Sequence, residues 1–146
     1  MRNFKQNLLF VILGIVLFCS TVFAVIDDQQ EQEIGKAAVN QVFSAYSNYS
    51  LGGFDAVVSD GFMPLRSEFM NRVDVSAINQ QTVEFNVSID QVLVSEQKMS
   101  VMCKWYKKFT VSGIPGQQKN QGSSELIFKL EDEQWKLISI SGDNPF

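Results

Sequence analysis

The chain has 146 residues, 12 basic and 16 acidic side chains, a formal net charge of −4 and no histidine. Without histidine, the chain cannot use a histidine general base, a Cys–His nucleophile or a histidine-rich zinc site. The acidic balance argues against nucleic-acid binding, which needs lysine and arginine opposite the phosphates, and we expect no metal and no cofactor either.

Residues 1–24 are typical of a secretory signal peptide. Arg2 and Lys5 precede an apolar run from Leu8 to Phe18, and Val22-Phe23-Ala24 places small residues at the two cleavage positions. The alternative is an uncleaved anchor, because the uncharged stretch is nearly long enough to span a bilayer. We expect a periplasmic or secreted protein, in contact with the membrane only if this segment is retained.

Residues 25–146 are predicted to form a single domain, long enough for one hydrophobic core. Cleavage of the signal removes Cys19 and leaves Cys103 as the one cysteine, so no internal disulfide can form. Cys103 lies between Val101 and Trp105 on the apolar side of a predicted strand. We interpret it as a small buried hydrophobe rather than a catalytic thiol.

The domain is predicted to begin with helices. Apolar residues recur at helical spacing between Asp27 and Ser50, and acidic residues crowd the start, where the helix dipole favours anions. Gly52-Gly53 ends this helix. Residues 54–59 predict one or two further helical turns, and residues 65–72 a third short helix after Pro64.

Four consecutive β-strands are predicted between Thr82 and Gly142. Thr82–Asp90 alternates apolar and polar residues, and the phase then slips, which predicts a β-bulge near Asp90–Gln91. Met99–Val111 keeps one phase throughout. Ser112–Gly122 is rich in glycine and polar residues and predicts a solvated loop that joins a hairpin.

Residues 125–130 and 135–140 predict the last two strands, joined by a short acidic turn, and short links favour an antiparallel meander. Met102, Tyr106 and Ile127, with one of the two apolar pairs of the last strand, predict a second apolar face. A sheet that is apolar on both faces needs two covers. The helices supply one, and we expect a second copy of the chain to supply the other.

This order of elements resembles the nuclear transport factor 2-like superfamily, also called SnoaL-like or cystatin-like. The segment from Phe128 to Leu137 is similar to its recurrent ending, in which an acidic turn separates Phe-x-apolar from Trp-Lys/Arg-apolar. The resemblance covers about residues 28–142. It implies an α+β fold with N-terminal helices packed on a curved, bulged four-stranded antiparallel sheet that forms a cone. It further implies a pocket at the open end of the cone and a homodimer through the outer sheet face.

The superfamily includes enzymes, binding modules and scaffolds, so the fold alone does not choose the function. We expect a non-catalytic module that binds a protein or, in an apolar cone pocket, a small apolar or anionic molecule. The pocket candidates are Tyr46, Phe85, Trp105, Lys107 and Phe128.

Two other functions stay open. Ketosteroid isomerase-like members of the superfamily imply a tyrosine, a carboxylate base and an acid on a late strand. Tyr46 or Tyr49 supplies a tyrosine and Asp60 a base, but Leu126 and Phe128 stand where the acid is needed, so we predict no catalytic residue. A scaffold domain of an envelope or secretion assembly requires the N-terminal segment to remain as an anchor.

Lys107 occupies an inward position of a strictly alternating strand, although an unpaired buried ammonium is costly. Three interpretations remain. A bulge at Lys107–Lys108 turns the side chain outward, the side chain reaches solvent at the mouth of the cone, or the ammonium lines the pocket and meets an anionic ligand.

Overall fold

The structure is a computed structural model that describes residues 28–48 and 52–146. The expected signal peptide and Tyr49 lie outside these residues. Within the described ranges, no helix is long and apolar enough to cross a membrane.

Helices α2 (Asp28–Ser47), α3 (Gly53–Val57) and α4 (Arg66–Asn79) precede the sheet. The first two agree with the prediction, whereas α4 continues well past its predicted end at residue 72. Only Phe69 and Val73 of this helix are buried. Because the apolar stripe is so narrow, the sequence pattern does not predict the last two turns.

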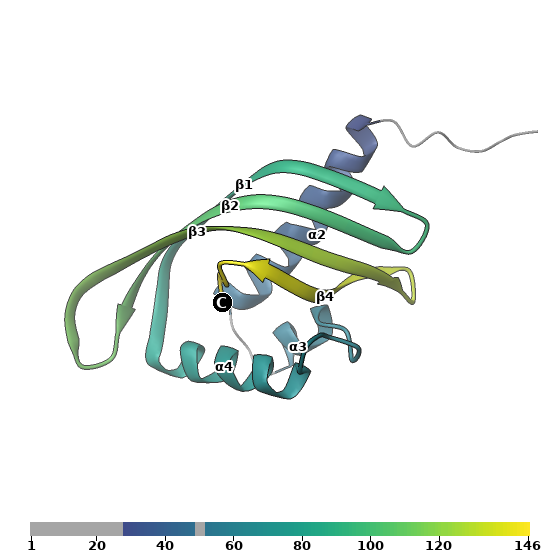
Figure 1. Cartoon of the computed structure of the whole chain (residues 1–146). Helices are drawn as coiled ribbons and strands as arrows, with labels where there is room; N and C mark the ends of the chain where they lie inside the picture. The colour runs from purple at the N-terminus through teal and green to yellow at the C-terminus, as the bar shows by residue number, and fades with distance from the viewer. Residues whose placement is uncertain (1–27, 49–51) are drawn as a thin grey trace, which may run out of the picture.

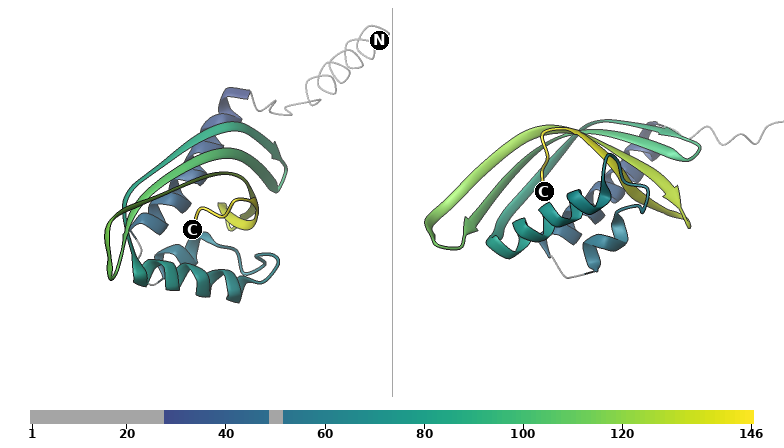
Figure 2. Two further views of the ribbon diagram at one scale, coloured as in Figure 1. Left: turned by 60° about the vertical axis from the view of Figure 1, so that its left-hand side comes forward. Right: turned by 60° about the horizontal axis from the view of Figure 1, so that its bottom comes forward.

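The strands β1 (Gln80–Ser95), β2 (Lys98–Val111), β3 (Ile114–Glu131) and β4 (Gln134–Gly142) form one antiparallel sheet in sequence order. The sheet arches over the helices (Figure 1). All three helices lie on its concave side, with α4 across the open side of the arch (Figure 2). The predicted α+β architecture, with its antiparallel meander, is confirmed.

β-Bulges decide which side chains face the helices. In β1, one bulge lies at Asp90, where the sequence predicted it, and a second lies at Val83. In β4, Ile138 is the additional residue. Each bulge inserts one residue and reverses the alternation. As a result Leu137 and Ile140 both pack on the core, although their spacing placed them on opposite faces.

The predicted loop at Ser112–Gly122 is wrong, because most of this segment is strand. Only Ser112-Gly113 turns the chain, with Gly113 at a φ of 82°. Pairing with β2 begins at Ile114 and is irregular at Pro115-Gly116. The segment extends the hairpin beyond the main core. There the backbone hydrogen bonds of the ladder join the two strands, so the segment needs no alternation of apolar and polar side chains.

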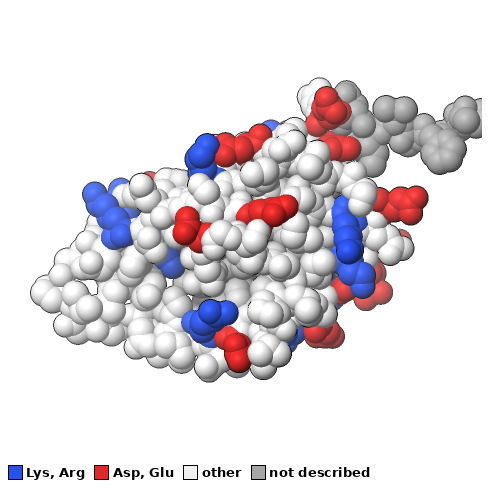
Figure 3. Space-filling view, viewed as in Figure 1, with Lys and Arg blue, Asp and Glu red and all other residues white. Residues whose placement is uncertain are grey.

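Charged side chains of both signs are interspersed on the face shown in Figure 3. Several charged side chains form ion pairs between elements. Nη2 of Arg66 lies 2.7 Å from Oδ1 of Asp55, and Nζ of Lys104 lies 2.9 Å from Oδ2 of Asp90. Exposed pairs of this kind contribute little stability, on the order of 0–1 kcal/mol each. The fold therefore depends on the core between the sheet and the helices.

Gly35 lies where α2 closely approaches β1. A Cβ at this position would lie 2.5 Å from Cγ2 and 2.9 Å from Cγ1 of Val92. We expect Gly35→Ala to destabilise the protein by about 1–3 kcal/mol through overpacking, although alanine favours a helix by about 1 kcal/mol over glycine.

Urea unfolding measures this effect. In a double-mutant cycle, Val92→Ala should recover part of the loss, because the methyl groups that clash are removed. A Gly35→Ala protein as stable as the wild type would contradict the tight packing.

Candidate functional site

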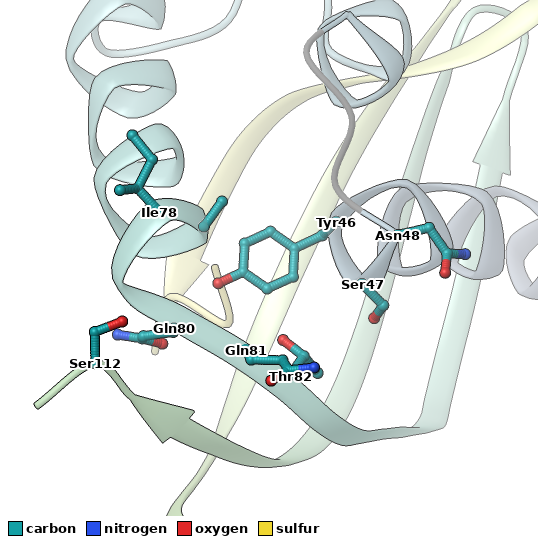
Figure 4. A pocket seen from close by; sticks show the side chains of 9 residues that line it. Tyr46, Ser47, Asn48, Ile78, Gln80, Gln81, Thr82 and Ser112 are labelled. Carbon is teal, nitrogen blue, oxygen red and sulfur yellow. The ribbon is translucent and has the colours of Figure 1, made fainter. Parts of the chain in front are cut away.

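A pocket of about 390 Å³ opens where the ends of α2 and α4 meet the start of β1. The ring of Tyr46 reaches from α2 across this space toward the start of β1 (Figure 4). Hydroxyl and amide groups predominate, and no carboxylate from the described ranges lines the pocket. The lining residues are Tyr46, Ser47, Asn48, Ala77, Ile78, Gln80, Gln81, Thr82 and Ser112.

Behind Tyr46 lies the buried ammonium of Lys107. Its residue is only 5% exposed, and Nζ donates a hydrogen bond to the Tyr46 hydroxyl at 3.2 Å. Nζ also lies 5.0 Å from the ring centroid of Tyr46, 5.8 Å from that of Phe85 and 5.2 Å from that of Phe109. Among the described residues, no carboxylate forms an ion pair with it. Ring faces and one hydroxyl thus stand in for a counter-ion.

Two of the three interpretations of Lys107 are wrong. The residue pairs with Phe85 in regular register, and the nearby bulge lies at Val83 on the partner strand, so Lys107 is not turned outward. Its low exposure also rules out a side chain that reaches solvent. Lys107 faces the interior, as the pocket interpretation requires.

The structure brings four of the five predicted pocket residues into one group of contacts. Tyr46 and Phe85 have ring centroids 5.9 Å apart, and Lys107 contacts both. Trp105 packs against Phe85 at 6.4 Å and donates from Nε1 to Ser124 Oγ at 2.9 Å. Phe128 is 0% exposed within the core. Tyr46 is the one predicted residue that lines the open pocket.

Tyr46 and Asp60 do not form a common site. Asp60 lies in the turn between α3 and α4, with a fully exposed carboxylate 3.7 Å from Nε of Arg66. The backbone amide of Ser59 joins this turn to β4, because it donates a hydrogen bond to the Leu137 carbonyl at 2.9 Å. Tyr46 instead contacts the end of α4 that leads into β1. The predicted isomerase-like pair of Tyr46 and Asp60 is therefore not brought together.

Sequence reasoning missed the polar residues at the junction of α4 and β1. Ser76 Oγ lies 2.8 Å from the Tyr46 hydroxyl. The buried Oε1 of Gln80 has no hydrogen-bond partner in the part of the chain that the structure describes. A buried acceptor of this kind needs a donor from a ligand or a water molecule. The only sequence signal was a polar run at a helix–strand boundary, which is also typical of a plain connection.

No protein-family model and no curated protein matches the sequence. Solved structures do match its shape. A conserved protein from Planctomyces limnophilus has a TM-score of 0.66 at 11% identity, over 79% of this chain and 99% of that chain. A ketosteroid isomerase-like protein from Erwinia carotovora atroseptica has a TM-score of 0.62 at 13% identity, over 80% and 98%.

A nuclear transport factor 2-like superfamily protein from Salmonella enterica serovar Typhimurium also has a TM-score of 0.62, at 11% identity over 80% of this chain and 91% of that chain. The chain therefore has the nuclear transport factor 2-like fold, as the sequence resemblance implied. Identities this low establish the fold alone.

Burial, together with a smaller effect of the nearby charge of Asp90, raises the pKa of the Cys103 thiol to about 11. At about pH 8 the thiol is therefore protonated and unreactive. We expect no reaction of folded protein with Ellman's reagent and complete reaction in guanidinium chloride. The measurement uses a Cys19→Ser chain, so that Cys103 is the one thiol. Fast reaction without denaturant would show that the site opens to solvent.

Proposed function

We propose that the protein is an exported, non-catalytic binding module whose cone pocket takes a small amphipathic molecule with an acidic group. The observation that carries this proposal is the buried ammonium of Lys107, which has no carboxylate partner among the described residues. A buried charge without a counter-ion is costly. An anionic ligand would offset that cost, so its binding would stabilise the folded protein.

Tyr46 connects the cation with the pocket. Its hydroxyl accepts a hydrogen bond from Lys107 and stands among the pocket-lining groups. With the ammonium behind it, the hydroxyl becomes a stronger donor toward an anion in the pocket. Gln80, which also lines the pocket, offers a second polar group of the ligand an acceptor that has no partner among the described residues. A volume of about 390 Å³ suits a small molecule.

An isomerase-like enzyme is the second candidate, because a hydroxyl polarised by a lysine can stabilise an oxyanion. Proton abstraction next to a carbonyl also needs a base within hydrogen-bond reach of the substrate. No carboxylate from the described ranges lines the pocket. Binding accounts for the Tyr46–Lys107 pair without such a base, and we prefer it.

Calorimetric titration with octanoate and with the neutral octanamide tests the role of the ammonium. We expect wild-type protein to prefer the acid, and Lys107→Met to weaken octanoate binding by roughly tenfold, or about 1.4 kcal/mol, with octanamide unaffected.

The matched control is Lys108→Met, one residue along β2. Nζ of Lys108 lies 2.5 Å from Oε2 of Glu84 and does not bond Tyr46, so the loss of this ammonium should leave the affinity for octanoate unchanged. A folded Lys107→Met protein that still prefers octanoate would refute the proposal.

The outer face of the sheet supports a second proposal, a homodimer. Leu93 and Met102 are 57% and 49% exposed on neighbouring strands. Ile127 lies on the next strand, where it pairs with Ser100, which in turn pairs with Leu93. These apolar side chains form a small patch among polar ones. A second copy would cover it and leave the ion pairs at its rim.

One native mass spectrum of protein recovered from exporting cells tests both export and assembly. We expect a mass that lacks residues 1–24 and a dimer that Met102→Lys converts to a monomer, because a buried, unpaired lysine opposes association. A chain that retains its N-terminal segment would favour the membrane-anchored scaffold instead. A wild-type monomer would contradict the dimer.

A further inference from the structure

The residues that follow β4 turn back into the concave side of the sheet. Gly142 has a φ of 81°, which permits the turn. Asp143 is then fixed to β3: its amide donates to the Ser123 carbonyl at 2.9 Å, and its Oδ2 accepts from the Ser123 amide at 3.0 Å. Ser124 Oγ donates to the Asp143 carbonyl. The end of the chain consequently lies inside the arch (Figure 2).

The ring of Phe146 stands in the middle of an aromatic nest, made of five rings from three helices and β1. Its centroid is 5.2 Å from those of Phe43, Tyr46 and Phe54, 6.2 Å from Phe69 and 6.5 Å from Phe85. Edge-to-face and tilted contacts at these distances are favourable for aromatic rings. The nest is thus a site shaped for one ring, and Phe146 supplies that ring.

Ring packing holds Phe146 in the nest. The hydrogen bond of its backbone amide stays within residues 143–146 and does not reach the sheet. The Phe146 amide donates to Asn144 Oδ1 at 3.1 Å, a turn that Asn-Pro favours. The hydrogen bonds that fix the tail to the sheet are those of Asp143. Phe146 is also only partly buried. Its ring can therefore leave the nest while the sheet remains intact.

The nest adjoins the buried cation. Lys107 Nζ and the Phe146 ring contact the same two rings, those of Tyr46 and Phe85. A ligand that places an aromatic ring where Phe146 lies can therefore direct an acidic group to Lys107. The same ring also borders Tyr46, whose hydroxyl reaches the open pocket.

We propose that the aromatic nest is the binding site for the ring of an aromatic acid, and that Phe146 is an internal competitor which the ligand must displace. This rests on the proposed binding function and names its ligand class. While Phe146 occupies the nest, the ligand cannot bind. The apparent affinity for the ligand is therefore the intrinsic affinity multiplied by the fraction of molecules in which the nest is open. The tail therefore sets the ligand concentration at which the site responds.

The test measures binding of 3-phenylpropionate and of toluene to the full chain, by calorimetry and by thermal unfolding. We expect Phe146→Ala to have a lower melting temperature than the wild type. It should bind 3-phenylpropionate at least about tenfold more tightly, because the competitor is gone. Toluene should raise its melting temperature, as small apolar ligands do in engineered apolar cavities.

Two further variants separate the loss of Phe146 from a general loosening of the tail or the core. Asp143→Ala loosens the tail but retains the nest and Phe146, and should give a smaller gain in affinity. Leu126→Ala, which opens a cavity at a fully buried position of β3, should give none. In wild-type protein, saturating 3-phenylpropionate should abolish the nuclear Overhauser contacts between the rings of Phe146 and Phe54.

No gain with either probe in Phe146→Ala, or ligand bound to wild-type protein with those ring contacts intact, would overturn the proposal. Toluene carries no charge, so its result concerns the nest alone. The octanoate titration with Lys107→Met judges the anion-binding function separately.

Discussion

The concave face of a bulged sheet has to be filled, because an apolar void loses the dispersion contacts that stabilise a core. In this protein the filling comes from different parts of the chain. Val39 and Val42 of α2, both fully buried, supply part of it, aromatic rings from all three helices fill the middle, and Phe146 enters from beyond β4. A polar pocket stays open at the junction of α4 and β1.

Lys107 places a charge in this interior at a cost to the fold. Three ring faces and the Tyr46 hydroxyl stabilise the ammonium, but each is weaker than a carboxylate at contact distance. A methionine at this position would pack the same space without that cost. The proposed function gives the lysine a reason to be there, and the aromatic nest beside it gives the anion an apolar partner.

Fold and site were predictable to different degrees. Period-two alternation correctly placed β1, β2 and the bulge at Asp90, and the inward phase of Lys107, because local sterics and burial impose that period directly. The acidic turn and its following tryptophan carried the resemblance to the fold. The long hairpin arm was not predictable, because ladder hydrogen bonds form with almost any polar sequence.

The sequence by itself determined the order of the helices and strands, the side of β2 on which Lys107 lies, and the absence of any histidine chemistry. Only the tertiary structure decided that Lys107 meets Tyr46 and that Phe146 meets the rings of Phe43 and Phe54. These contacts join residues 61 to 103 positions apart, and no local period encodes a partner so distant. The curvature of the sheet and the turn at Gly142 bring them together.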